Sequence, residues 1–341
     1  MAAYISFQPQ DYFSPKLYTG TGSELAITSV GFQPDLIWIK ERTGTESQTW
    51  TDAVRGATKW ISSNNTDGEV TTAESVKSFD SGGFTLGTSG GINTSSDTYV
   101  SWNWKMGTTS GLTGGTITPS AYSISATAGQ SVIAYTGTMA LATVPHGLGK
   151  APKLIICKQY DTGRHWNVYW GPLGATKYME LDGSAAAGTS STRWNDTEPD
   201  ATVFTVKNQD ETNGAGTMLA YCFTDVKGYS KFGSYTGNGN VDGPFIYTGF
   251  RPAYIMIKST SGAGAWAIFD NKRSEYNVVD KQLAANTTEV DQTSDVLDIL
   301  SNGFKIRATS NMVNGSGWEY IYSAFAEFPV VSSNSKAGVA R

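Results

Sequence analysis

Short runs in which apolar and polar residues alternate recur along the whole chain. Residues 98–104 read Thr-Tyr-Val-Ser-Trp-Asn-Trp, and residues 154–157 form an unbroken apolar run, Leu-Ile-Ile-Cys. Alternation with a period of two predicts half-buried β-strands, and short unbroken apolar runs fit strands buried on both faces. Turn residues such as Asn238-Gly239 separate the runs at intervals of about eight to twelve residues. The pattern predicts an all-β fold, with 291–300 as a candidate for a short helix.

This pattern occurs three times along the chain. Each copy begins with the tripeptide Tyr-Thr-Gly, continues to a proline and an apolar strand that ends in lysine, and then reaches a tryptophan. The landmarks are Tyr18, Pro34, Lys40 and Trp50 in the first copy, Tyr135, Pro152, Lys158 and Trp166 in the second, and Tyr235, Pro252, Lys258 and Trp266 in the third. Since the offsets between these landmarks are nearly constant, chance is a poor explanation and an internal triplication is the better one.

The landmarks divide the chain into three tandem units with short flanking segments. We expect an N-terminal arm at 1–17, β units at 18–107, 131–230 and 231–328, a Gly/Ser/Thr-rich connector at 108–130, and a C-terminal arm at 329–341. A length of about 100 residues suits one β-sandwich or jelly-roll-like unit. A β-propeller would repeat every 40–50 residues or so.

Composition and charge narrow the classes of function. The chain has a net charge of −5, 16% charged and 12% aromatic residues, and only two cysteines and two histidines. These values argue against a disulfide scaffold, a disordered chain, a histidine-based multi-metal enzyme and a nucleic-acid-binding protein. Neither a signal peptide nor an apolar run of about 20 residues is visible. We therefore expect no nucleic-acid or membrane partner and no cofactor, and a chain made in a cytoplasm.

The three copies serve as an internal control for residues that could carry chemistry. Cys157, Cys222, His146 and His165 all occupy positions that hold other residue types in the other two copies, so the shared fold does not require them. We interpret the cysteines as small buried strand residues and the histidines as turn or surface residues. Paired carboxylates of the glycosidase kind are the remaining catalytic candidates. They are Glu41 with Glu46, Asp196 with Glu198 and Asp200, and Asp291 with Asp295, all in polar, turn-like surroundings that favour a solvated surface.

The aromatic residues are the candidates for binding. Trp102 and Trp104 lie two positions apart in a predicted strand and therefore share one face. Core packing or a subunit interface is the favoured role, and a sugar-stacking platform is the alternative. The candidate binding or interface residues are Trp38, Trp102, Trp104, Trp166 and Trp266 of the units and Tyr4, Phe7, Tyr12 and Phe13 of the N-terminal arm.

Several segments together resemble a repeat found in virion proteins of tailed bacteriophages, especially phages of marine bacteria and cyanobacteria. They are 17–22 (Leu-Tyr-Thr-Gly-Thr-Gly) after Phe13, 31–40 (Gly-Phe-Gln-Pro-Asp-Leu-Ile-Trp-Ile-Lys), 54–59 (Val-Arg-Gly-Ala-Thr-Lys), 228–239 (Gly-Tyr-Ser-Lys-Phe-Gly-Ser-Tyr-Thr-Gly-Asn-Gly), 243–253 (Gly-Pro-Phe-Ile-Tyr-Thr-Gly-Phe-Arg-Pro-Ala) and the final Ala340-Arg341. The resemblance covers nearly the whole chain. It implies a non-enzymatic component of the virion and supplies no catalytic residues.

The resemblance leads to one main hypothesis and two alternatives. The main hypothesis is a virion surface protein, either a capsid decoration or knob or a tail accessory protein, which binds capsid or tail proteins. We expect its arms to anchor it, in part by adding strands to open sheet edges. A homotrimer is expected, with a monomer of internal pseudo-threefold arrangement as the other possibility. The alternatives are a tail-fibre protein that recognises a host surface glycan and a capsule depolymerase.

Overall fold

The computed structural model describes residues 8–328, and nearly all regular structure in this range is β. The predicted all-β fold is confirmed. The helices are single turns, α1 (Gly90–Asn93), α2 (Asp210–Asn213), η1 (Pro9–Asp11) and η2 (Gly171–Leu173). The helix considered for 291–300 is wrong, because Leu297–Leu300 forms strand β24 and pairs with β25 (Gly303–Ile306). Isolated short helices are marginal in water, whereas a four-residue strand gains a ladder from its neighbour.

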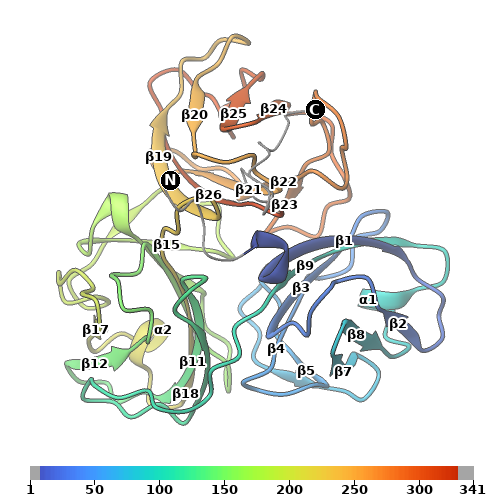
Figure 1. Ribbon diagram of the computed structural model, residues 1–341. Helices are drawn as coiled ribbons and strands as arrows, with labels where there is room; N and C mark the ends of the chain where they lie inside the picture. Colours follow the sequence, from blue (N-terminus) through green and yellow to red (C-terminus); the bar gives the residue numbers. More distant parts are fainter. Residues whose placement is uncertain (1–7, 329–341) are drawn as a thin grey trace, which may run out of the picture.

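The strands form three lobes arranged around a common centre (Figure 1). Each lobe has a large sheet toward the centre, which we call the inner sheet. The inner sheets are β1 (Phe13–Thr19), β9 (Thr98–Trp104), β3 (Leu36–Glu41) and β4 (Thr49–Asp52) in the first lobe; β10 (Ala121–Ser125), β11 (Gln130–Thr136), β18 (Thr217–Phe223), β13 (Leu154–Gln159), β14 (Asn167–Trp170), β15 (Lys177–Glu180) and β16 (Gly188–Thr189) in the second; and β19 (Ser230–Thr236), β26 (Glu319–Phe325), β21 (Tyr254–Ser259), β22 (Ala267–Asp270) and β23 (Leu283–Ala284) in the third, each given in spatial order.

A smaller outer sheet covers the far face of each inner sheet. The outer sheets are β2 (Leu25–Ile27), β8 (Gly83–Leu86) and β7 (Val76–Asp80) in the first lobe, β12 (Ala142–Pro145) and β17 (Val203–Val206) in the second, and β20 (Phe245–Tyr247), β25 and β24 in the third, while β5 (Lys59–Trp60) and β6 (Val70–Thr71) form a separate pair. A buried hydrophobic cluster fills the space within each lobe. Each lobe is therefore a two-layer β-sandwich.

The strand boundaries differ by a few residues from the expected divisions of the chain. Strand β1 begins at Phe13 and pairs with β9, so residues 13–17 of the expected arm belong to the first inner sheet. Strand β10 lies within the expected connector. The first difference arises because the Tyr-Thr-Gly tripeptide lies at the end of the first strand shared by the units, whereas the first expected unit begins with it. Pro15 is tolerated within β1 because β1 is an edge strand.

The Tyr-Thr-Gly landmark has a structural cause that is the same in every lobe. In the second lobe the Tyr135 hydroxyl donates to the Thr212 carbonyl at 2.5 Å, next to the buried Asn213. A side chain at Gly137 would collide with the Gly214 carbonyl oxygen, only 1.9 Å from a Cβ placed there. The equivalent residues are Tyr18, Gly20 and Asn93 in the first lobe and Tyr235, Gly237 and Asn314 in the third. In each lobe, the motif therefore holds the loop after the strand against a second loop that carries a buried asparagine.

Asn213 joins three loop segments through its amide. Its Oδ1 accepts from the Thr138 N–H at 2.8 Å, and its Nδ2 donates to the carbonyls of Ala140 at 2.7 Å and Lys207 at 2.8 Å. Asn93 and Asn314 make the corresponding bonds in their lobes. The sequence comparison of the three copies did not single out this asparagine.

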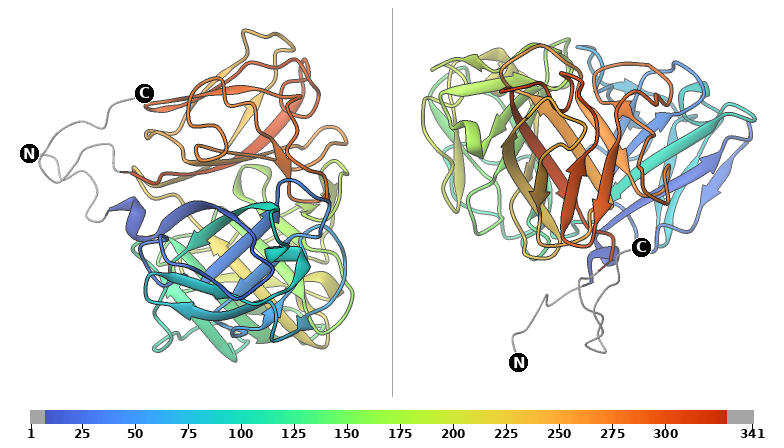
Figure 2. Two further views of the ribbon diagram at one scale, coloured as in Figure 1. Left: turned by 90° about the vertical axis from the view of Figure 1, so that its right-hand side faces the viewer. Right: turned by 90° about the horizontal axis from the view of Figure 1, so that it is seen from above.

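A second set of buried side chains, the axial cluster, lies between the three inner sheets. It includes Phe13, Leu36, Trp38, Trp50, Trp102 and Trp104 of the first lobe, Leu154, Ile156, Trp166, Trp170, Tyr221 and Phe223 of the second, and Phe232, Tyr254, Met256, Trp266, Ile321 and Phe325 of the third. Strands β3, β13 and β21 are consequently buried along their whole length. The described ends of the chain, at η1 and just after β26, lie on the same side of the molecule (Figure 2).

Replacing Asn213 with alanine should destabilise the protein strongly. The change removes the three hydrogen bonds of this side chain to main-chain groups and leaves those groups without their partner. Each buried unsatisfied group costs about 1–3 kcal/mol. We expect a loss of about 3 kcal/mol in the free energy of unfolding, measured by urea unfolding with tryptophan fluorescence. The exposed Asn208 is the control, and Asn208→Ala should change this value by less than about 0.5 kcal/mol. Equal losses in both variants would contradict the role given to Asn213.

Candidate functional site

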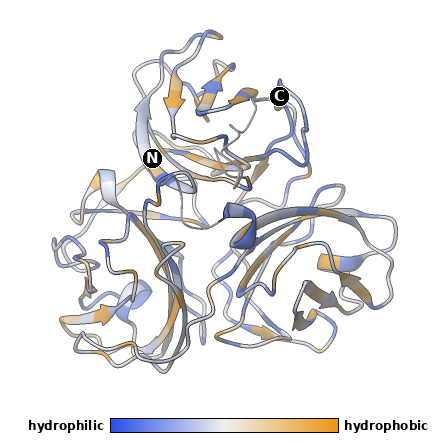
Figure 3. Ribbon diagram, in the orientation of Figure 1, coloured by the Kyte–Doolittle hydropathy of each residue, from blue (hydrophilic) through white to orange (hydrophobic). Residues whose placement is uncertain are grey.

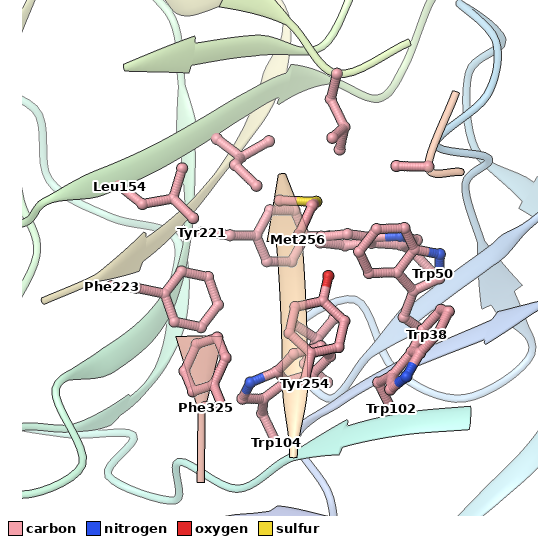
Figure 4. Packing of buried hydrophobic residues seen from close by; sticks show 14 of the residues in the cluster. Trp38, Trp50, Trp102, Trp104, Leu154, Tyr221, Phe223, Tyr254, Met256 and Phe325 are labelled. Carbon is pink, nitrogen blue, oxygen red and sulfur yellow. The ribbon is translucent and has the colours of Figure 1, made fainter. Parts of the chain in front are cut away.

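The aromatic candidates from the sequence meet in the axial cluster. Trp38, Trp102 and Trp104 are exposed by 2%, 0% and 3%, and Trp166 and Trp266 by 0% and 1%. Their rings contact rings from other lobes, as for Trp104 with Tyr254 at 6.0 Å, Trp50 with Trp166 at 5.3 Å and Trp170 with Trp266 at 6.4 Å between centroids. Figure 4 shows Trp38, Trp102 and Trp104 converging with side chains from the other inner sheets, such as Phe223 and Tyr254. Because they are buried, these five tryptophans cannot stack on a sugar from solution. They form an interface between lobes of one chain.

The N-terminal candidates divide into two groups. Phe13 is fully buried in the axial cluster, with its ring centroid 5.1 Å from that of Trp104. Tyr12 is partly buried and packs against the same cluster. Tyr4 and Phe7 lie outside the described residues.

A small cavity of about 20 Å³ lies within the axial cluster. Equivalent residues of the three lobes line it, namely Leu36, Leu154 and Tyr254, then Trp38, Ile156 and Met256, then Trp104, Phe223 and Phe325, together with Trp50 and Ser323. Ser323 occupies the position held by Trp102 and Tyr221 in the other lobes. The volume suits one water molecule at most, and a cavity with this apolar lining stays dry. The cavity is too small for a substrate.

Three buried lysines connect the lobes in a ring. The Nζ of Lys40 donates to the Thr288 carbonyl of the third lobe at 3.1 Å, and that of Lys158 donates to the Thr66 carbonyl of the first lobe at 2.8 Å. Lys258 completes the ring through the carbonyls of Ser184 and Ala185 in the second lobe, at 3.2 and 2.9 Å. All three lysines have no exposed surface. Desolvation lowers the pKa of each to about 8.

Buried ion pairs reinforce two of the three lobe contacts. Asp270 pairs with Arg273 at 2.6 Å and also accepts from the Trp102 Nε1 of the first lobe at 3.2 Å. In the first lobe, Asp52 pairs with Arg55 at 2.7 Å and accepts from the hydroxyl of Tyr221 in the second lobe at 2.9 Å. Trp170 stands at the corresponding position of the second lobe, where an apolar ring replaces the carboxylate.

The cysteines and histidines occupy places that the fold explains. Cys157 and Cys222 are free and buried within the second lobe, and burial raises the pKa of the Cys157 thiol to about 12. Burial lowers the pKa of His146, whose Nδ1 accepts from the Leu148 N–H at 3.2 Å. His165 is exposed and contacts Asp182 at 2.8 Å. A nucleophilic thiol needs a lowered pKa and access to solvent, and Cys157 has neither.

Four of the candidate carboxylates, Glu41, Glu198, Asp200 and Asp291, are engaged by nearby donors. Glu198 accepts from the Tyr169 hydroxyl at 2.5 Å, and Asp291 pairs with Arg42 at 2.8 Å and with Arg273 at 2.9 Å. The others are Glu41, which accepts from the Glu46 N–H; Asp196, which is exposed; Asp200, which accepts from the N–H groups of Thr202 and Val203; and Asp295, which is buried with a pKa raised by desolvation. Within residues 8–328, no three His, Cys, Asp or Glu side chains are grouped so that they could hold a metal ion. The same range contains no helix of the length and apolarity needed to cross a bilayer.

Apart from Phe328 at the end of the described chain, the most exposed aromatic residues lie on or beside the outer sheet of the third lobe. Phe245 and Tyr247 of β20 are exposed by 46% and 65%, and Tyr276 beyond the opposite edge of this sheet by 66%. Figure 3 shows the hydrophobic character of β20 at the outside of this lobe. The positions equivalent to 245 and 247 hold Ala26 and Thr28 in the first lobe and Thr143 and Pro145 in the second. This difference is visible in the sequence when the three copies are compared residue by residue, but not in the landmarks that the copies share.

Comparison with known proteins places the chain in one family. The sequence profile of a family described as a domain of unknown function (DUF7483) matches residues 8–329. The match covers nearly the whole chain, and the chain belongs to this family. No curated protein matches it.

The buried lysines give a pH dependence that a single substitution isolates. An unfolded lysine has a pKa near 10.4, while that of Lys258 is about 8 in the folded protein. Between pH 8 and 10 the unfolded chain therefore holds a proton that the folded one has released, so this group's contribution to stability rises with pH. Relative to Lys258→Met, the wild type should gain up to about 1.4 kcal/mol per pH unit across this window.

Urea unfolding of both proteins at pH 7.5, 8.5 and 9.5 measures this difference. Buried thiols and tyrosines have raised pKa values, so their contributions to the free energy of unfolding fall with pH over the same range. These contributions are the same in both proteins and cancel in the difference. Lys150 is exposed, so Lys150→Met should give a difference that does not vary with pH. A constant difference for Lys258→Met would contradict the buried charge.

Proposed function

We propose that this member of the DUF7483 family is a non-enzymatic structural component of a tailed-bacteriophage particle, and that it acts through contacts with other particle proteins. The observation that carries the proposal is the closed ring of lobe contacts, in which each buried lysine reaches into the next lobe. A body closed in this way is rigid and has three similar sides. It can occupy a threefold position of a symmetric particle with three similar contacts.

The ring also bears on the oligomeric state. The sequence favours a homotrimer, but one chain already supplies three equivalent lobes around a common centre (Figure 1). We therefore propose that a single chain, with internal pseudo-threefold symmetry, is the unit that enters the particle. The chain would be made in the host cytoplasm and would function in the virion.

The position of the described chain ends supports attachment through one face. Phe13, near the start of the described chain, packs on Phe325 with 5.4 Å between the ring centroids. Burial lowers the pKa of the nearby Lys16, and the negative charge of Glu327 partly opposes this shift. The body leaves its outer sheets free when it is held from this side (Figure 2). A capsid decoration or tail accessory protein needs this arrangement, with one face attached and the others available.

The two alternatives have less support from the same residues. A glycan-binding tail fibre would use exposed tryptophans, and the five tryptophan candidates are buried. A depolymerase would need two carboxylates free to act on a sugar, and Glu198 and Asp291 are held by a tyrosine and by arginines.

Labelling of purified particles tests the proposal. Antibodies raised against the recombinant chain should decorate particles of the phage that encodes it at fixed, symmetry-related positions, as seen by gold labelling in electron microscopy. Mass spectrometry of the same particles should find the chain in a constant ratio to the major capsid protein. A chain that is abundant in infected cells but absent from purified particles would overturn the proposal.

A further inference from the structure

Strand β20 has a free edge. The Thr248 N–H donates to the Asn302 carbonyl at 3.0 Å and the Ile306 N–H to the Pro244 carbonyl at 3.1 Å, which fixes the pairing register of β20 with β25. Successive residues of an antiparallel strand direct their main-chain groups to opposite sides. Ile246 therefore pairs with β25, while the N–H and C=O groups of Phe245 and Tyr247 point away from it. Within the described range, these outward groups receive no hydrogen bond from another segment.

The corresponding edge of the second lobe is covered by the chain itself. Thr143 stands at the position of Phe245. Its N–H donates to the Thr116 hydroxyl at 2.8 Å, and its carbonyl accepts from the N–H groups of Thr116 and Ile117, both at 3.0 Å. Ile117 is 6% exposed and joins the core of that lobe. A short, uncharged segment, bent at residues 115–117, thus satisfies this edge and buries an apolar side chain in the lobe.

Within residues 8–328, no segment of the chain covers the corresponding edge of the third lobe. The covering segment of the second lobe belongs to the stretch that precedes the lobe, between β9 and β10. Before the third lobe, only residues 224–229 separate β18 from β19, and they form the turn that starts β19. The part of the chain that the structure describes therefore leaves the edge of β20 uncovered.

The side chains at this edge differ from those of the other lobes in a way that the shared fold does not require. Phe245 and Tyr247 are exposed, as is the nearby Val241 at 62%. An exposed hydrophobic edge strand invites pairing with another chain, and proteins usually protect such edges with charges or prolines. The charged groups nearby are already paired, since Asp242 contacts Lys305 at 2.8 Å. The surroundings thus favour an uncharged partner.

We propose that the free edge of β20 binds an extended, uncharged segment of another protein by strand addition. The segment would pair its main chain with Phe245 and Tyr247 and place apolar side chains on their rings. Residues 116–117 supply the precedent for main-chain contact at this edge, since their N–H groups donate to Thr143 of β12. The binding site stands on the geometry of the edge, and the identification of the partner as a particle protein rests on the proposed function.

Hydrogen exchange and peptide binding test the site on the purified full chain. In the free protein the amides of Phe245 and Tyr247 should exchange quickly and that of Ile246 slowly. The probes are a peptide of residues 111–119, Gly-Leu-Thr-Gly-Gly-Thr-Ile-Thr-Pro, and nine-residue peptides selected from a display library. Bound peptides should slow the exchange of the Phe245 and Tyr247 amides.

Phe245→Pro is the decisive variant. It removes an outward N–H while the bonds of Ile246 to β25 remain, and proline is tolerated on the open side of an edge strand. Peptide binding should weaken about tenfold, as expected for the loss of one to two main-chain hydrogen bonds. Ala26→Pro, at the equivalent edge of the first lobe, is the matched control and should bind as the wild type does. If Phe245→Pro lowers the melting temperature, Tyr247→Lys provides a second test, because a lysine also blocks pairing at an edge.

Three results would overturn the inference. The first is that no peptide protects Phe245 and Tyr247, or that binding survives both edge variants. The second is self-association of the chain that Phe245→Pro abolishes, which would make a second copy the occupant. The third is glycan binding that survives Phe245→Pro and is lost in Tyr247→Ala, which would assign the face to sugar. None of these results depends on particles, so the inference can fail while the proposed function stands.

Discussion

The molecule depends on the burial of the second face of each inner sheet. A two-layer sandwich needs only one apolar face per sheet, and the other can be polar and exposed. Here Leu36 and Trp38 face the centre while Ile37 and Ile39 face the interior of the lobe, so both faces of β3 are apolar. A single lobe would expose the central face to water. Three lobes packed around one axis cover one another, and the closed arrangement leaves none of these faces exposed.

The polar groups on the central faces make this packing specific. Burying a lysine without a carboxylate partner is costly. It is tolerated here because main-chain carbonyls of the next lobe accept hydrogen bonds from the lysine Nζ. The same lysines would be unsatisfied if the lobes met in another register. Trp170 and Ser323 show that the symmetry is approximate, since Trp170 stands where the other lobes have an aspartate and Ser323 lines the small central cavity where they have Trp102 and Tyr221. The hydrogen bonds of the three lysines are common to all lobes and fix how the lobes meet, while the apolar residues between them differ from lobe to lobe.

Approximate symmetry also separates scaffold from function within one chain. Positions alike in all three lobes, such as the asparagine exemplified by Asn213, are explained by the fold. Positions that differ and are exposed, such as Phe245 and Tyr247 against Ala26 and Thr28, have no explanation in the scaffold. Three lobes that carry the same framework can therefore still differ in surface residues at single places, as at the edge of β20.

Local patterns in the sequence determined the class of fold and the repeated landmarks. The alternation at 98–104 correctly placed Trp102 and Trp104 on one face, because side-chain direction in a strand follows from its period alone. The same alternation could not say what covers that face, since a sibling lobe, a second chain and a sugar all fit an apolar strand. Only the tertiary structure decided this, by bringing residues more than a hundred positions apart, such as Trp102 and Asp270, into contact. It alone also revealed the free edge of β20, because whether a strand is covered depends on the course of distant segments and not on the strand itself.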